Sequence, residues 1–176
     1  FLHLHERDCS VQRRNQKVVE EALAPNIDET NKQKLFSTCV NAMEKMGYLG
    51  LGTLEFLFDG NEFYFMEMNT RLQVEHPITE MLTRVDLVRE QICVAHGDKI
   101  FTNQDNIKPL GHSIECRINA ENSKNFKPSV GRIEMYHPPA GNGIRLDTFI
   151  YSGYKVPHYY DNLLAKLIAT GRTRNH

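Results

Sequence analysis

The first pattern along the chain is a helical spacing of apolar residues ahead of Gly47. The residues that share this spacing are Leu35, Phe36, Cys39, Val40, Met43 and Met46. Residues three and four positions apart lie on one face of a helix, so the spacing predicts a helix from about Asp28 or Thr30 to Met46. Thr30 and Gln33 fit a capping box at its start, and Gly47 suits its end.

Two alternating apolar runs follow in residues 51–69, on either side of the turn-forming sequence DGN. Alternation with a period of two indicates strands, so this segment is predicted to be a β-hairpin. Further along, shorter helices are predicted for residues 78–84 and from Asp86 to about His96, where Gly97 ends the pattern.

The rest of the chain is predicted to be rich in strands. Strands are expected for the opening residues 1–7 and for 111–121, 131–139, 143–149 and 163–169. The polar stretch 102–111 has the composition of a boundary between two domains. The fold class is therefore predicted to be α+β, with an α+β domain in residues 1–110 and a mostly β domain in residues 111–176.

Composition and charge exclude several classes of protein. The 176 residues are 40% apolar and 24% charged, which is typical of a globular protein. The net charge of -1 lacks the basic excess of a duplex nucleic-acid binder, and no nucleic-acid partner is expected. Neither an apolar run long enough to span a membrane nor a secretory signal is found, which predicts a cytoplasmic protein, or one of the mitochondrial matrix if eukaryotic.

A row of polar side chains directly follows the apolar run FYFM, in the sequence EMNTRLQVEHP of residues 67–77. The residues at every second position are Glu67, Asn69, Arg71, Gln73 and Glu75. Because side chains alternate between the two faces of a strand, Glu67 and Asn69 are expected to share a face with Phe65. Burying charged and amide groups costs free energy, so their place on a core strand suggests a functional site.

Whether Glu55 joins this face depends on the hairpin loop. A two-residue loop would put Glu55 opposite Tyr64, on the other face. A three-residue loop with the sequence DGN pairs Glu55 with Phe65 and leaves it diagonal to Glu67. A shared site therefore predicts the three-residue loop.

Glu55, Glu67 and Asn69 would together form a site of oxygen ligands. Such a site suits magnesium or manganese bridging phosphate oxygens better than zinc. The alternative is that both glutamates lie on a solvated face of the sheet. Arg71 favours a site, because its planar guanidinium matches a carboxylate, bicarbonate or phosphate.

Arg117 is a weaker candidate. In an extended strand it shares a face with Glu115 and Asn119, so it can point into a cleft. Taken alone, it would be an ordinary surface arginine.

Long blocks of sequence carry a more specific signal. They are ERDCSVQRRNQKVVEEALAP, GTLEFLFDGNEFYFMEMNTRLQVEHPITEM, VDLVREQI, GHSIECRINAE and GYKVPHYYDNLLAKLI. In these blocks and their order the chain resembles the biotin carboxylase family of ATP-grasp enzymes. The resemblance implies the C-terminal lobe of an ATP-grasp fold followed by a truncated, mostly β C-terminal domain. The family's N-terminal domain and glycine-rich loop would precede residue 1, so the fragment alone is expected to be inactive.

The resemblance also implies roles for the matching residues. The metal-binding residues would be Glu55, Glu67 and Asn69, holding a pair of Mg²⁺ or Mn²⁺ ions. The ATP-binding residues would be Gln12, Asn15, Glu55, Leu57 and Glu67, although family members vary at the position of Asn15. Bicarbonate would be held by Lys17, Arg71, Gln73 and the backbone of Val74. Glu75 resembles the general base, Arg117 would bind biotin, and the catalytic set is Lys17, Arg71, Glu75 and Arg117. Cys9 and His76 are expected to be structural.

The implied reaction is the ATP-dependent carboxylation of biotin with bicarbonate, through carboxyphosphate. The implied partners are a biotin carboxyl carrier protein, a carboxyltransferase component and a second copy of the intact protein. Acetyl-CoA carboxylase, an enzyme of fatty acid biosynthesis, is the first expectation for the complex. Two alternatives stay open: another bicarbonate-phosphorylating ATP-grasp ligase, similar to carbamoyl phosphate synthetase, and a non-catalytic fragment.

Overall fold

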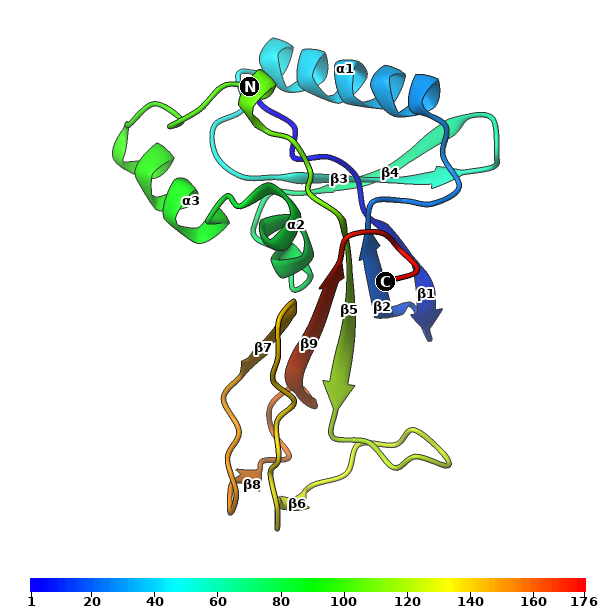
Figure 1. Ribbon diagram of the computed structural model, residues 1–176, viewed down its shortest axis with the longest axis vertical. Coiled ribbons are helices and arrows are strands. Elements are labelled where there is room, and N and C mark those ends of the chain that lie inside the picture. Colours follow the sequence, from blue (N-terminus) through cyan, green and yellow to red (C-terminus); the bar gives the residue numbers. More distant parts are fainter.

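The computed structural model describes all of residues 1–176 and has the predicted α+β composition. The helices are α1 (Glu29–Met46), α2 (His76–Thr83) and α3 (Leu87–His96), with a short 3-10 helix, η1 (Gln104–Asn106). The strands are β1 (Asp8–Arg13), β2 (Gln16–Ala22), β3 (Thr53–Phe58), β4 (Phe63–Asn69), β5 (His112–Asn119), β6 (Gly131–Arg132), β7 (Ile144–Thr148), β8 (Lys155–Val156) and β9 (Leu163–Gly171). The helices gather at one end of the molecule, and the antiparallel strands β5 and β9 lie between that end and the end that carries β6 and β8 (Figure 1).

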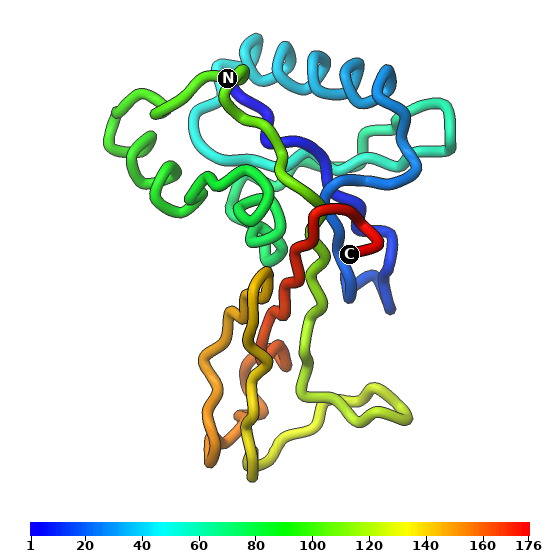
Figure 2. Tube along the Cα trace, viewed as in Figure 1, coloured from blue at the N-terminus to red at the C-terminus, as the bar shows by residue number.

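The main sheet has the strand order β1-β2-β5-β9-β7, and its neighbouring strands are antiparallel. β1 and β2 come from the first 22 residues, whereas β5, β7 and β9 follow residue 111. Segments distant in sequence therefore lie side by side in one sheet, as the trace in Figure 2 shows. None of the helices combines the length and the apolar character that crossing a membrane needs.

The helix α1 is confirmed, but its predicted cap is wrong. The side chain of Asp28 caps α1 by accepting a hydrogen bond from the backbone N–H of Asn31 at 2.9 Å. Asp28 has the extended backbone that an N-cap requires, whereas Thr30 already lies inside the first turn. Gly47 ends the helix as predicted, with a φ of 61° in the left-handed region.

The hairpin of β3 and β4 is confirmed, but the predicted three-residue loop is wrong. Phe58 pairs with Phe63, so the loop holds four residues. The side chain of Asp59 closes the loop by accepting hydrogen bonds from the backbone N–H groups of Asn61 and Glu62, at 2.9 and 2.8 Å.

A β-bulge at Met66 changes the register of this hairpin. Phe56 pairs with Phe65, but Glu55 pairs with Glu67, which leaves Met66 without a partner on β3. The predicted face shared by Phe65 and Glu67 is therefore wrong, because the extra residue turns Glu67 to the opposite side. The rings of Phe56 and Phe65 pack 5.7 Å apart on one face, and Glu55 and Glu67 share the other.

The strand predictions outside the hairpin succeed in part. β5, β7 and β9 confirm the predicted strands 111–121, 143–149 and 163–169, whereas only Gly131–Arg132 of 131–139 is a strand. Residues 1–7 form no strand, since this segment bonds to side chains instead of a neighbouring strand. His3 donates its backbone N–H to Gln104 Oε1 at 2.9 Å and stacks on Phe36 at 4.1 Å.

The helix α2 packs on the main sheet and closes a small apolar core. This core contains Ala22, Ile78, Leu82 and Ile168, each at most 2% exposed. Both predicted helices of this region are confirmed, as α2 and α3. Since α2 follows residues 70–75 directly, its packing also fixes the segment that carries Gln73 and Glu75.

Replacing Ile78 by alanine should therefore destabilise the protein. Ile78 is fully buried in this core, and such a truncation leaves a cavity that costs about 2–5 kcal/mol. Ile92→Ala on α3 is the matched control, because Ile92 is 65% exposed. Urea unfolding should show the loss for I78A alone; equal losses for both variants would contradict this account of the core.

Candidate active site

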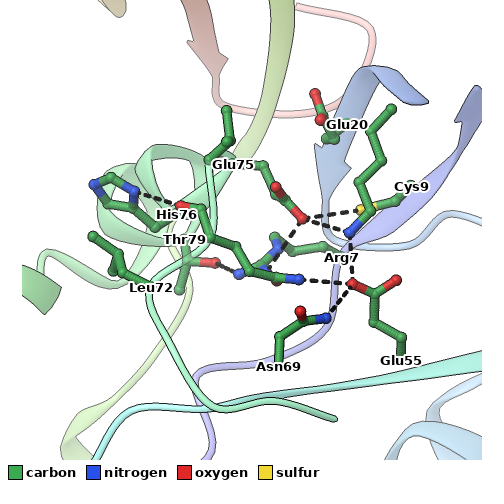
Figure 3. A network of polar contacts seen from close by, with 12 residues as sticks. Arg7, Cys9, Glu20, Glu55, Asn69, Leu72, Glu75, His76 and Thr79 are labelled. Carbon is green, nitrogen blue, oxygen red and sulfur yellow. Dashed lines mark hydrogen bonds and ion pairs between the residues drawn. The ribbon is translucent and has the colours of Figure 1, made fainter. Parts of the chain in front are cut away.

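A network of polar side chains lies where the β3–β4 hairpin, the segment 70–75 and the main sheet meet. Figure 3 shows part of this network: Glu55 and Asn69 point toward one another, and so do Glu75 and Arg7. The hairpin contributes Glu55, Glu67 and Asn69, and the segment contributes Gln73 and Glu75. The main sheet contributes Lys17 from β2 and Arg117 from β5. Residues from three parts of the chain thus form one site.

Glu55 and Glu67 converge as predicted. They are direct partners across the hairpin, and the amide of Asn69 bridges them. Asn69 Nδ2 donates to Glu55 Oε1 at 3.1 Å and to Glu67 Oε1 at 2.9 Å. Like charges placed opposite one another destabilise a sheet, so this pair requires a compensating positive charge.

These residues fit a divalent cation. Glu67 is exposed and forms no ion pair with the protein, so its carboxylate remains available. A half-turn of the Asn69 amide about its last side-chain bond would exchange nitrogen for oxygen and present a third oxygen. Carboxylate and amide oxygens are the ligands that Mg²⁺ and Mn²⁺ prefer.

Lys17 connects the hairpin to the main sheet. Its Nζ donates to Glu55 Oε1 at 2.9 Å and to Glu75 Oε1 at 2.7 Å. Burial acts to lower the pKa of Lys17, but its hydrogen bonds with Glu75 and Glu55 outweigh burial and raise it. The ammonium therefore stays charged at neutral pH.

Glu75 is almost fully buried, at 2% exposed. Burial acts to raise the pKa of this carboxyl, yet the charges of Arg7 and Lys17 more than offset burial and hold the pKa below its usual value. The Nη2 atom of Arg7 lies 3.8 Å from Glu75 Oε1. Glu75 is consequently a buried carboxylate that is ionised at neutral pH and can accept a proton.

Gln73 is held in one orientation. Its Oε1 accepts a hydrogen bond from Arg7, and its Nε2 donates to Glu55 Oε1 at 2.7 Å. Arg7 is fixed in turn by donating to Thr79 Oγ1 on α2 at 3.1 Å. The amide N–H groups of Gln73 are thereby directed into the site. The adjacent carbonyl of Val74 accepts a hydrogen bond from Lys166 Nζ at 3.0 Å, which anchors the segment to β9.

Arg117 points into the site, as its place on β5 suggested. Its Nε donates to Glu20 Oε1 at 2.7 Å, and its Nη2 donates to Glu75 Oε2 at 3.0 Å. Glu20 therefore holds the Nε–Nη2 edge of the guanidinium, and the same Nη2 atom reaches Glu75.

Other predicted site residues lie outside this network. Arg71 is exposed, and its guanidinium donates to the carbonyl of Leu72 at 3.1 Å rather than to a carboxylate, so it remains available to an anion. Gln12 and Asn15 lie at the tip of the β1–β2 hairpin, where Asn15 has a φ of 63°. Leu57 is 60% exposed on the face of β3 that carries Glu55.

Cys9 and His76 have the structural environments predicted for them. Burial raises the pKa of the Cys9 thiol to about 12, despite nearby Lys17, so no thiolate forms at neutral pH. His76 Nδ1 donates to the carbonyl of Gln73 at 2.8 Å, and burial lowers the pKa of its ring. This contact holds the turn into α2.

Three members of the network were missed in the sequence. They are Arg7, Glu20 and Thr79. Glu20 had a usable signal, since it alternates with Val18 and Ala22 on one strand face and is thus a charge among apolar residues. Arg7 and Thr79 had no such signal, because Arg7 contacts Gln73 and Thr79, which lie 66 and 72 residues further along the chain.

Replacing Arg7 by methionine should destabilise the protein by about 3 kcal/mol at neutral pH, since it leaves a buried carboxylate short of one compensating cation. The lowered pKa of Glu75 contributes stability above the pKa of an unfolded glutamate, and this is lost as pH falls through the folded value. The destabilisation measured by urea unfolding should therefore shrink at acidic pH. R89M is the control, because Arg89 is exposed and makes no ion pair; a loss independent of pH would contradict the assigned cause.

Family models match both parts of the chain. The model described as "Carbamoyl-phosphate synthase L chain, ATP binding domain" matches residues 1–102, and "Biotin carboxylase C-terminal domain" matches residues 115–176. A protein of Pseudomonas aeruginosa named biotin carboxylase is 52% identical over 174 residues, which cover 99% of this chain and 39% of that protein. The chain thus spans about two fifths of the length of the curated relatives it matches.

Solved structures of similar proteins share the fold. Biotin carboxylase of Campylobacter jejuni, in a complex with a form of ATP, has a TM-score of 0.95 and 47% identity, covering 99% of this chain and 39% of that one. The biotin carboxylase domain of Hydrogenobacter thermophilus 2-oxoglutarate carboxylase, in complex with MgADP, ADP and bicarbonate, has a TM-score of 0.93 and 48% identity, covering 97% and 38%. With both family models matched in order, the chain belongs to the biotin carboxylase family, whose ATP-binding domain is of the carbamoyl-phosphate synthase type.

Proposed function

We propose that the protein carboxylates biotin with bicarbonate at the expense of ATP. The observation that carries this proposal is the contact of Glu75 with both Lys17 and Arg117. Lys17 belongs to the region matched by the ATP-binding model, and Arg117 belongs to the region matched by the biotin carboxylase model. Glu75 therefore lies between Lys17, which we assign to bicarbonate, and Arg117, which we assign to biotin.

Bicarbonate activation is assigned to the Glu75 end of the site. Glu75, ionised at neutral pH, accepts the proton of the bicarbonate hydroxyl. Lys17 and Gln73 hold the anion with N–H donors, and the unpaired guanidinium of Arg71 together with the backbone of Val74 completes its binding site. The deprotonated oxygen attacks the γ-phosphorus of ATP, which yields carboxyphosphate and ADP. Positioning supplies most of the rate enhancement.

The divalent cations of this reaction are assigned to Glu55, Glu67 and Asn69. The carboxylates converge from neighbouring strands, and Glu67 has no cationic partner. Mg²⁺ or Mn²⁺ would neutralise charge on the ATP phosphates during phosphoryl transfer. Gln12, Asn15 and Leu57 are assigned to nucleotide binding, at the exposed tip of β1–β2 and on the Glu55 face of β3.

Carboxyl transfer is assigned to the Arg117 end. Carboxyphosphate breaks down into CO2 and phosphate, the phosphate takes the N1' proton of biotin, and N1' then attacks CO2. Negative charge develops on the ureido oxygen of biotin as that proton leaves. The Arg117 guanidinium stabilises this charge because Glu20 already holds it in place.

Phosphorylation of bicarbonate followed by attack of ammonia on carboxyphosphate, which gives carbamate and releases phosphate, is the second candidate, since residues 1–102 match a carbamoyl-phosphate synthase ATP-binding model. Residues 115–176 and the placement of Arg117 favour biotin. Stimulation of ATP hydrolysis by free biotin distinguishes the two.

For the complex, we propose acetyl-CoA carboxylase of fatty acid biosynthesis, with a biotin carboxyl carrier protein, a carboxyltransferase component and a second copy of the protein as partners. The support is that bacterial relatives are named simply biotin carboxylase. The biotin carboxylase domain of 2-oxoglutarate carboxylase is 48% identical to this chain, and the name of that enzyme indicates a different carboxyl acceptor. Coupled assays with each carboxyltransferase would decide between acetyl-CoA and other acceptors.

The full-length protein should hydrolyse ATP in a bicarbonate-dependent reaction that biotin stimulates. Glu75→Gln should lower kcat by about 10²–10⁴-fold, because glutamine cannot accept the bicarbonate proton. Glu67→Gln should raise the Mg²⁺ concentration needed for half-maximal rate, and Glu62→Gln, on the exposed hairpin loop, should match the parent. The fragment 1–176 alone should turn nothing over. An E75Q protein with parental activity would overturn the proposal.

A further inference from the structure

Glu115 is a buried acid that the proposed mechanism does not use. It lies on β5, two residues before Arg117 and on the same strand face, and its exposed fraction is 0%. Neither of its carboxylate oxygens has a hydrogen-bond partner. An ionised carboxylate without partners in such a place would carry a large desolvation cost.

Glu20 is the neighbour of Glu115 on the adjacent strand. The two residues are direct partners in the β2–β5 register, and Glu20 is also 0% exposed. Only Glu20 has a cationic partner, since its Oε1 accepts from Arg117 Nε at 2.7 Å. Its other oxygen, Oε2, has no partner. Two carboxyl groups held side by side in a buried place do not both ionise.

The charged groups around Glu115 come from every element packed against it. They are Glu20 on β2, Arg117 on β5, Lys166 on β9 and Glu75 at the start of α2. Lys166 donates instead to the Val74 carbonyl and lies 3.5 Å from Asp147. Glu80 of α2 pairs with Arg145, and His76 lies 4.0 Å from Glu80. Lys166 and Arg117 favour the ionised form of Glu115 from a distance, but neither forms an ion pair with it.

We propose that Glu115 is held as a neutral carboxylic acid, so that Glu20 alone carries the negative charge that positions Arg117 for biotin. This inference rests on the proposed function for the role of Arg117, but not for the protonation of Glu115. Glu20 and Glu115 then share one proton and one negative charge between them. Both act on the reaction as positioning residues, through Arg117.

The neutral state of Glu115 matters for the direction in which Arg117 points. Ionised, Glu115 would add a second carboxylate on the sheet side of Arg117 and compete with Glu75 for the guanidinium. Burial and the charge of Glu20 raise the pKa of Glu115 to about 8, so ionisation begins at mildly alkaline pH. The contribution of Glu115 to the free energy of unfolding is fully present below the pKa of an unfolded glutamate and is lost as pH rises through this folded value.

Infrared spectroscopy of the full-length protein in D2O tests the protonation directly. A protonated carboxyl band should be present at pH 7, fade as pH rises past about 8, and be absent from Glu115→Gln. Glu134→Gln is the matched control, because Glu134 is exposed and forms no ion pair, and it should keep the band. A parent without the band at pH 7, or an E115Q protein that retains it, would overturn the proposal.

Glu20→Gln tests the sharing of charge. With Glu20 neutral, Arg117 needs another counterion and the repulsion on Glu115 is gone, so Glu115 should ionise and the infrared band should vanish at pH 7. Persistence of the band in E20Q would contradict the shared charge. If E20Q fails to fold, the E115Q spectrum still decides whether Glu115 is neutral.

Kinetics test the positioning of Arg117. E20Q should lower kcat/KM for biotin by about 10–100-fold, the loss expected when one hydrogen bond to a charged group is removed. Biotin carboxylation by the parent should fall as pH rises past about 8, and this fall should be lost in E115Q and kept in E134Q. An unchanged alkaline limb in E115Q would overturn the positioning role. Absence of any biotin-dependent activity in the parent would refute the proposed function but leave the infrared result standing.

Discussion

The ion pair between Lys17 and Glu75 is the interaction on which the rest of the site depends. The two groups are 2.7 Å apart, and Glu75 is almost fully buried. A carboxylate in that position is tolerated only when cations offset its desolvation, which Lys17 and Arg7 do. Lys17 also contacts Glu55, so the same ammonium connects the main sheet to the hairpin. Loss of this ammonium would leave Glu75 without its nearest cation and Glu55 without its ion pair.

Charge in this region is arranged so that each buried ion has a defined partner. Glu75 meets Lys17 and Arg117, whereas Glu20 meets Arg117 alone. Glu115, with no partner, is the exception, and neutralisation is the physical route that remains to it. The electrostatic interactions among these side chains are strong because the groups are shielded from water. Each charged side chain is also held in one orientation by its neighbour.

The β-bulge at Met66 has a comparable role on the hairpin. Without it, the pairing of Phe58 with Phe63 would place Glu55 and Glu67 on opposite faces. The extra residue separates an aromatic face from a face of oxygen ligands within one strand. A local irregularity of the backbone thus produces the convergence of carboxylates on which cation binding depends.

The sequence alone located most of the helices and several of the strands, and it predicted most of the residues of the candidate site. Helical spacing located α1 and α3, alternation located β5 and β9, and long family-like blocks named Lys17, Glu75 and Arg117. These features are local or compositional, so they can be read along the chain. The register of the hairpin, the neutral Glu115 and the contacts of Arg7 were decided by tertiary structure. Each depends on groups far apart in sequence, whose approach and burial no local pattern records.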